Sequence, residues 1–249
     1  MSFSFSHFRD LFLRKNFYQQ VAPDSASLMA RASYEFRTSL NGIVGYAEFL
    51  ENSTTAPMMN FTGKIIRESS SNLTRSCNSY FDLQYLQKSQ VKFSSTQLNL
   101  QAVLLDVVNL HQPYALERGI SIQLTYGQDA QSKSVCSDVS RIRQILDALI
   151  FNTLKIAETW DVIRINLSWC ADTDKLLLAI ELRQTKRDLS KLKLLESFWN
   201  TEGYQFQLLE GPGVEMALAK SLIRLGGISA RYDVSQESAG TLQLLMPAS

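Results

Sequence analysis

The sequence lacks an excess of charge and contains few cysteines. Its 25 basic and 24 acidic residues leave a formal net charge of +1, and Lys and Arg are spread along the chain without a basic run. No strong field is therefore available to attract nucleic acid or an anionic membrane. The three cysteines, Cys77, Cys136 and Cys170, are far apart and form no CxxC pair. This favours reduced thiols in a cytosolic protein.

Long apolar runs are also missing. The N-terminal stretch MSFSFSHFRDLFLRKNFYQQV is rich in Phe, but Arg9, Asp10, Arg14 and Lys15 make it too polar to cross a bilayer. With no signal-peptide pattern either, we expect a cytoplasmic chain without a transmembrane segment. Residues 1–24 can form an amphipathic helix whose apolar side consists of Phe5, Phe8, Leu11 and Phe12. We expect it to pack on the body of the protein; docking to a membrane or a partner is the alternative.

Two apolar stripes of helical period lie between residues 25 and 90. In the first stripe the spacings are three and four, which is typical of helices that pack lengthwise: Met29, Ala32, Phe36, Leu40, Ile43, Ala47 and Leu50. Residues 53–57 break the pattern, and a second stripe follows with Phe61, Ile65, Leu73, Cys77, Tyr80 and Leu83. The stripes predict a helical hairpin. Because two helices alone bury little surface, we expect the hairpin to pair with a copy of itself in a dimeric four-helix bundle.

The outer face of the first helix carries a different set of side chains. Tyr34 lies two residues from both Ala32 and Phe36, which is a rotation of about 200° on a helix, so it points away from the apolar stripe. Thr38 lies one turn further along the same face. This face is either a docking surface or a solvated helix face. The candidate partner-binding residues are Tyr34, Arg37, Thr38 and Asn41.

After residue 90 the pattern changes to a mixture of helices and strands. Helices are predicted at residues 98–117, 139–157 and 213–225, and Asp138 is in place to cap the second. Strands are predicted at residues 120–126, 162–169, 176–182, 228–234 and 241–246, with a hairpin turn at residues 171–174. Because helices and strands do not strictly alternate, residues 91–249 predict an α+β domain with helices on one face of a sheet.

The segment SYEFRTSLNGIVG, residues 33–45, resembles the phosphoacceptor motif of bacterial sensor histidine kinases. The family pattern is close to S-H-E-L-R-T-P-L-N-x-I-x-G, and here Tyr34 stands at the histidine and Ser39 at the proline. Three further blocks follow in the family's order. Together they make residues 30–247 similar to a transmitter region. The resemblance implies a dimerising helical hairpin followed by a GHKL-type ATP-binding domain, which is an α/β sandwich.

The second block, DVSRIRQILDALIFNTLK at residues 138–155, resembles the family's N box. The resemblance implies that Asn152 stands at the Mg²⁺-binding asparagine and Lys155 at a phosphate-binding lysine. Ala148 replaces an earlier asparagine of the box. Both retained residues also have ordinary structural uses, since an Asn can lie on any helix face and a Lys at a helix end interacts favourably with the dipole.

The third block, LRQTKRD at residues 182–188, stands where the family has V-x-D-x-G-x-G. Gln184 replaces the aspartate that reads adenine, and Lys186 and Asp188 replace two glycines. A glutamine offers a neutral carbonyl in place of a charged oxygen. Side chains at the glycine positions would occupy space that the family keeps open for its ligand.

The fourth block, GPGVEMA at residues 211–217, stands where the family has G-x-G-x-G-x-A. Gly211 and Gly213 are retained, and Glu215 replaces the third glycine. Glu215 adds negative charge near the start of a helix that the resemblance directs at phosphate, and the repulsion is roughly 1–3 kcal/mol in a partly desolvated site. The closing GTLQLLMP, residues 240–247, resembles the family's last strand. We therefore expect no cofactor, and no ATP or Mg²⁺, at this degenerate site.

Histidine phosphotransfer is excluded at the family's site. It needs an imidazole nitrogen that is nucleophilic near neutral pH, whereas a tyrosine phenol has a pKa of about 10. The only histidines, His7 and His111, lie outside the motif, and we expect both to be structural or surface residues. The chain is therefore predicted to be a pseudo-histidine kinase and not a kinase.

The leading hypothesis is a dimeric regulatory binding module of two-component signalling, which docks a response-regulator receiver domain or a kinase on the face around Tyr34. The alternative is a nucleotide-independent phosphatase of a response regulator. For this alternative, the resemblance implies that Glu35 and Thr38 belong to an E-x-x-T motif in which the Thr hydroxyl orients the attacking water. A third possibility is a residual nucleotide sensor or an atypical phosphotransfer protein.

Overall fold

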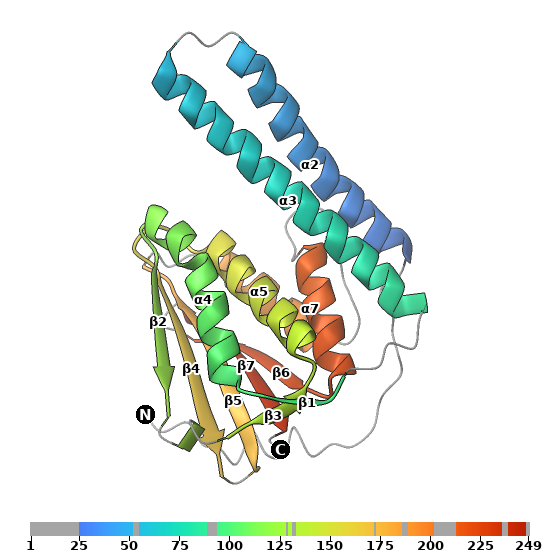
Figure 1. Cartoon of the computed structure of the whole chain (residues 1–249), viewed down its shortest axis with the longest axis vertical. Helices are drawn as coiled ribbons and strands as arrows, with labels where there is room; N and C mark the ends of the chain where they lie inside the picture. The colour runs from blue at the N-terminus through green and yellow to red at the C-terminus, as the bar shows by residue number, and fades with distance from the viewer. Residues whose placement is uncertain are drawn as a thin grey trace.

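The hairpin and the sheet domain expected from the sequence are both present (Figure 1). A computed structural model describes residues 25–51, 55–88, 94–127, 129–130, 133–171, 173–185, 189–201, 213–235 and 239–247. The amphipathic segment expected at residues 1–24 lies outside the described residues, and so do Lys186, Asp188 and Gly211. In the described part the hairpin rises above one end of the sheet domain.

Helices α2 (Ser25–Glu51) and α3 (Ala56–Lys88) form the hairpin. Their shared side buries Leu28, Ala32 and Leu83, and the Phe36 ring meets Tyr80 edge-on at 6.1 Å between ring centroids. Other members of the predicted stripes stay in solvent in the single chain: Met29 is 54% exposed and Leu40 47%, while Phe61 is 56% exposed. Two helices cover only one side of each other, so these side chains lie outside the intrachain contact.

A five-stranded sheet in the order β2-β4-β5-β7-β6 forms the base of the second part. Its strands are β2 (Ser121–Tyr126), β4 (Val162–Cys170), β5 (Lys175–Arg183), β6 (Ser229–Val234) and β7 (Ala239–Pro247). Strands β2 and β4 pair in parallel, and the remaining pairs are antiparallel. All five strands were predicted from the sequence. The short pair β1 (Thr96–Leu98) and β3 (Val135–Ser137) was not, because three residues are too few to show a period.

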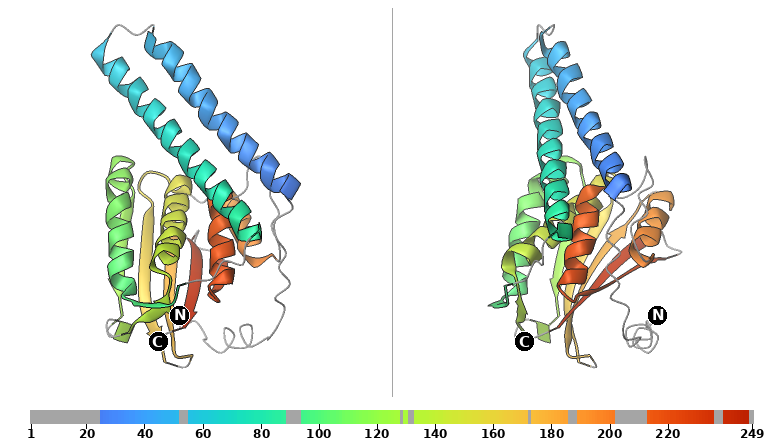
Figure 2. Two further views of the ribbon diagram at one scale, coloured as in Figure 1. Left: turned by 45° about the vertical axis from the view of Figure 1, so that its right-hand side comes forward. Right: turned by 90° about the vertical axis from the view of Figure 1, so that its right-hand side faces the viewer.

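Helices α4 (Leu100–Glu117), α5 (Val139–Ile156) and α7 (Val214–Leu225) cover one face of the sheet (Figures 1 and 2). The alternation in β4 shows this directly, since Ile163 and Ile165 are buried whereas Arg164 is exposed. Asp138 caps α5 as expected: its carboxylate accepts hydrogen bonds from the backbone N–H of Ser140 at 3.0 Å and of Arg141 at 3.2 Å. None of the described helices is both long and apolar enough to span a membrane.

Helix α6 (Ser190–Asn200) was not predicted, and it lies along the outer edge of the sheet. The Asn200 amide binds both backbone groups of Tyr232 in edge strand β6, donating to the carbonyl at 2.7 Å and accepting from the N–H at 3.2 Å. An unpaired strand edge is open to unwanted pairing, and this contact covers it. Leu189 precedes helix α6, and it provides no side-chain hydrogen bond to cap the helix.

Polar contacts along α3 fasten the hairpin to the sheet domain. Arg75 pairs with Asp147 of α5, which also binds His111 Nε2 of α4 at 2.8 Å. Further along α3, Asp82 accepts a hydrogen bond from Gln144 at 2.6 Å. His111 is 4% exposed and its ring stacks on Phe151, so it has a structural position as expected.

We expect Asp147→Asn to lower the free energy of unfolding at pH 7 by about 1–3 kcal/mol, because Arg75 and His111 lose a charged acceptor. Thermal unfolding measures this. Burial raises the pKa of Asp147, but the His111 hydrogen bond and the Arg75 charge lower it by more, so the folded-state pKa lies below the ordinary 3.8. A lowered carboxyl pKa stabilises the fold above the unfolded-state pKa, and this contribution is lost as pH falls through the folded-state pKa.

The difference between wild type and Asp147→Asn should therefore shrink below about pH 4. The matched control is Asp106→Asn, because Asp106 pairs with Arg143 at 2.8 Å but is 60% exposed. Its expected effect is at most about 0.5 kcal/mol. Equal effects of the two substitutions would contradict the role given to Asp147.

Candidate functional site

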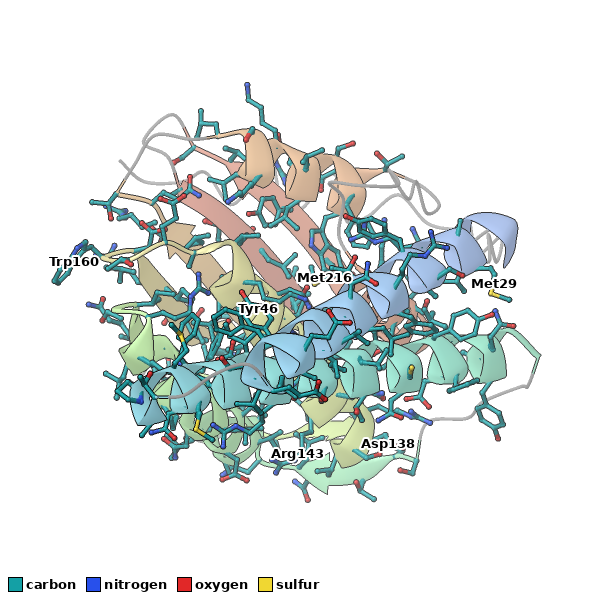
Figure 3. The ribbon with its side chains drawn as sticks, turned by 90° about the horizontal axis from the view of Figure 1, so that it is seen from above. Met29, Tyr46, Asp138, Arg143, Trp160 and Met216 are labelled. Atoms are coloured by element: carbon teal, nitrogen blue, oxygen red, sulfur yellow. The ribbon has the colours of Figure 1, made fainter. Side chains whose placement is uncertain are left out.

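An open cleft of about 590 Å³ lies between the hairpin and the sheet domain. Residues of α2 and α3 line one side, and residues of α5, α6 and α7 line the other. Figure 3 looks down on the hairpin and shows Met216 of α7, one of the lining residues, beside α2. The cleft thus brings the motif on α2 opposite the blocks that the resemblance assigned to nucleotide.

Two of the four candidate partner-binding residues line this cleft. Tyr34 is 40% exposed, and the Thr38 hydroxyl donates a hydrogen bond to the Tyr34 carbonyl at 2.9 Å. Its oxygen lone pairs remain able to accept a hydrogen bond from water. Arg37 and Asn41 are exposed on α2 and are not among the residues lining the cleft. The predicted face therefore has one part in the cleft and one part outside it.

Glu35 makes contacts that sequence reasoning did not predict. Its Oε1 accepts from Arg31 Nε at 2.9 Å and from the backbone N–H of Val214 at 3.1 Å, and its Oε2 accepts from Ser76 Oγ at 2.9 Å. Val214 is the first residue of α7, 179 positions further along the chain. Of these partners only Arg31, one helical turn away, could have been found from sequence spacing.

Asn152 and Glu215, which the sequence placed in different blocks, meet in the structure. Asn152 Nδ2 lies 3.3 Å from Glu215 Oε2 and 2.8 Å from the Ala148 carbonyl. Glu215 is 4% exposed, and burial raises the pKa of its carboxyl. The charges of Lys155 and Arg75 act against this rise, whereas Glu35 adds to it. The amide at the Mg²⁺-binding position of the family is therefore in contact with a carboxylate of the chain itself.

The remaining candidate nucleotide residues are less closely assembled. The Lys155 side chain is exposed in the cleft, with Nζ 5.1 Å from the Phe151 ring centroid. Gln184 follows β5, and its Oε1 is buried without a hydrogen-bond partner in the described part of the chain. Gly213 precedes α7 and lines the cleft. Between Asn152, α6 and the sheet, a cavity of about 20 Å³ remains, which has room for one water molecule.

Asp161 is a residue of this region that the sequence analysis missed. It is 1% exposed and accepts hydrogen bonds from the backbone N–H groups of Glu158 at 2.8 Å and Thr185 at 2.7 Å. It thereby fixes the chain beside Gln184. No spacing in the sequence connects an aspartate before β4 with a residue after β5. Within the described ranges, no three His, Cys, Asp or Glu side chains gather where they could hold a metal ion.

A helical hairpin above a sheet domain, with a cleft between them, is the architecture of histidine kinase transmitter regions. The Acinetobacter baumannii histidine kinase AdeS has this fold, with a TM-score of 0.60 and 15% identity over 86% of this chain and 97% of that one. Histidine kinase ThkA, in a complex with response regulator protein TrrA, gives a TM-score of 0.60 and 16% identity over 88% of this chain and 60% of that one.

Sequence comparison gives the same class. The autoinducer 2 sensor kinase/phosphatase LuxQ of Vibrio vulnificus is 23% identical over 232 residues, which cover 91% of this chain and 27% of the relative. The chain thus spans about a quarter of that relative's length. No protein-family model matches the sequence. The chain is therefore a homologue of sensor histidine kinases, and its fold is that of their transmitter region.

Glu215→Gln should raise the thermal unfolding midpoint at pH 7, because a glutamine carbonyl accepts the Asn152 hydrogen bond without a buried charge. Folding raises the pKa of this carboxyl, so its stabilising contribution is fully present below the ordinary 4.5 and is lost as pH rises through the folded-state pKa. The gain from the substitution should therefore disappear in acid. The exposed Glu51→Gln is the control, and a gain that is equal at every pH would contradict this account.

Proposed function

We propose that the chain is a dimeric regulatory binding module of two-component signalling that acts in the cytoplasm and has lost histidine kinase activity. Its partner is a response-regulator receiver domain or a kinase, and the docking surface is Tyr34, Arg37, Thr38 and Asn41 on α2. The observation that carries this proposal is the phenol of Tyr34, 40% exposed in the cleft, at the position of the family's phosphoacceptor imidazole.

Two contacts support the loss of nucleotide binding. Asn152, the position that holds Mg²⁺ in the family, is in hydrogen-bond contact with Glu215. The first N–H of α7, at the helix end directed at phosphate in the family, donates to Glu35. Both carboxylates would repel a nucleotide's phosphates, and Glu35 would also compete with phosphate for the N–H of Val214.

The exposed apolar side chains of the hairpin support a homodimer. Eleven large apolar or aromatic residues of α2 and α3 are at least 36% exposed: Met29, Tyr34, Leu40, Val44, Tyr46, Phe49, Met58, Met59, Phe61, Phe81 and Tyr85. Monomeric proteins rarely leave so many in one region. A second copy of the hairpin, packed lengthwise, completes a four-helix bundle and covers members of this set. ThkA, of the same fold, has been solved in a complex with a response regulator, which makes a receiver domain a reasonable partner class.

The proposal predicts that no nucleotide binds. Calorimetric titration with ADP and a non-hydrolysable ATP analogue, with Mg²⁺ present and protein at about 100 μM, should give no heat of binding. Tyr34→His restores the imidazole but should yield no phosphohistidine with ATP, because the nucleotide contacts are still missing. Micromolar binding together with phosphorylation of Tyr34→His would overturn the assignment as an inactive homologue.

Docking is tested with a panel of purified receiver domains, phosphorylated and unphosphorylated. Tyr34→Ala should weaken the binding of the matching receiver at least about tenfold, because aromatic anchors dominate such surfaces. Thr38→Ala should leave the affinity nearly unchanged. The control is Arg67→Ala, exposed on α3 and absent from the cleft lining. Unchanged affinity in Tyr34→Ala would refute docking through this face.

The alternative function is a receiver phosphatase that uses Thr38 without nucleotide. The hydroxyl lies in the cleft and can still accept a hydrogen bond from water, and the name of LuxQ includes a phosphatase activity for that relative. The two functions separate in the same panel. Under the alternative, Thr38→Ala abolishes loss of phosphate from the receiver while its affinity stays intact. Under the binding module, wild type and Thr38→Ala leave the phosphorylated receiver equally stable.

A further inference from the structure

The N-terminus of α7 is held by a side chain from the distant hairpin. The residue before the helix, Gly213, has no side chain with which to cap it. Glu35 Oε1 takes this role and accepts the N–H of Val214 at 3.1 Å. Free N–H groups and the helix dipole both favour an anion at this end of a helix. The anion here is supplied by the chain itself.

The Glu35 carboxylate is largely shielded from water and joins three helices. Its side chain is 16% exposed, and that of Arg31 is 10% exposed. Arg31 belongs to α2, Ser76 to α3 and Val214 to α7, and each donates to one of the two carboxylate oxygens. Hydrogen bonds to a charged acceptor are about twice as strong as neutral ones. A single side chain therefore connects both helices of the hairpin to the sheet domain.

Gly213 provides the space for this contact. A Cβ atom added at Gly213 would lie 2.7 Å from Glu35 Oε1, which is closer than real Cβ atoms approach. The Gly213 backbone, with φ −76° and ψ −178°, is extended and open to any residue. Glycine is thus needed here for the approach of Glu35 and not for an unusual backbone conformation.

We propose that Glu35 is an internal anion that latches the hairpin onto the N-terminus of α7, and that opening of this latch controls access to the cleft side of the docking surface. The control of access to the docking surface rests on the proposed docking function. Tyr34 precedes Glu35 directly and Thr38 lies one turn beyond Tyr34, and both line the cleft that the latch holds together. A partner that reaches them from this side binds the unlatched state, so the latch lowers its apparent affinity.

Hydrogen exchange at the Val214 amide tests the latch without any partner. Glu35→Ala removes the acceptor, and Gly213→Ala displaces the flexible end of Glu35 from the other side of the contact. Both should lower the protection factor of this amide roughly tenfold or more, because a hydrogen bond to a charged group is lost. Glu51→Ala, an exposed acid on the same helix, should leave it unchanged. Unchanged protection in both latch variants would overturn the proposal.

Affinity for the receiver panel tests the control of access. Gly213 lies on the sheet-domain side of the cleft. We expect Gly213→Ala to bind the receiver several-fold more tightly than wild type, and such an increase would report opening of the latch and not a new contact on the hairpin. If protection falls but receiver affinity stays the same, the latch exists and its control of docking is wrong. If protection falls and no receiver binds to wild type or variant, the latch stands and the proposed docking function fails.

Discussion

A carboxylate that is withdrawn from water needs hydrogen-bond donors, and at Glu35 those donors come from three helices. This requirement fixes where α7 can lie relative to the hairpin. Asp147 imposes a similar requirement further along, where it accepts from Arg75 of α3 and contacts His111 of α4. With two such points, α3 cannot slide along the sheet domain without leaving a charge unpaired. Both walls of the cleft are thus joined through these carboxylates in the structure.

Both anionic contacts at the cleft lie where the resemblance to histidine kinases places a nucleotide. Glu215 contacts Asn152, and Glu35 contacts the N-terminus of α7. The Glu35 contact occupies a backbone N–H at that helix end, and each of the two contacts places a carboxylate beside these groups. Tyr34, across the cleft, lacks the nucleophile that such a nucleotide would serve. Under the proposed function, the substitutions at Tyr34 and Glu215, one on each wall, both act against phosphotransfer.

The sequence predicted the parts of the fold that have a period. The two long helices and the five strands of the sheet were predicted from apolar patterns and turn signals, and the Asp138 cap from its residue type. The β1–β3 pair was missed because three-residue strands carry little periodic signal. Helix α6 was missed although it has 11 residues and its buried Leu192, Phe198 and Trp199 are spaced for one helix face. Met29 and Leu40 of the predicted seam are exposed in the single chain, because spacing gives the face of a helix but not the number of helices that cover it.

The candidate site was predicted as a list of positions and not as a set of contacts. The blocks identified Asn152 and Glu215 separately, but their meeting depends on how α5 and α7 pack. Glu35 was assigned to a phosphatase motif from its neighbours on α2, whereas its hydrogen bond to Val214 crosses 179 positions. Contacts of this range are set by tertiary packing, which a local pattern does not contain.

Gly213 shows why a residue of a known motif is weak evidence for the motif's chemistry. In the family the glycines of this block give a ligand room, and here Gly213 gives room to the Glu35 carboxylate. In both cases a glycine leaves space at the N-terminus of the helix. The anion in that space is a nucleotide phosphate in the family and the Glu35 carboxylate here. A chain that supplies this anion itself has a rigid support for α2 with no nucleotide bound. Under the proposed latch, this support holds α2 in place without a nucleotide, and a partner that reaches Tyr34 and Thr38 from the cleft side has to release it first.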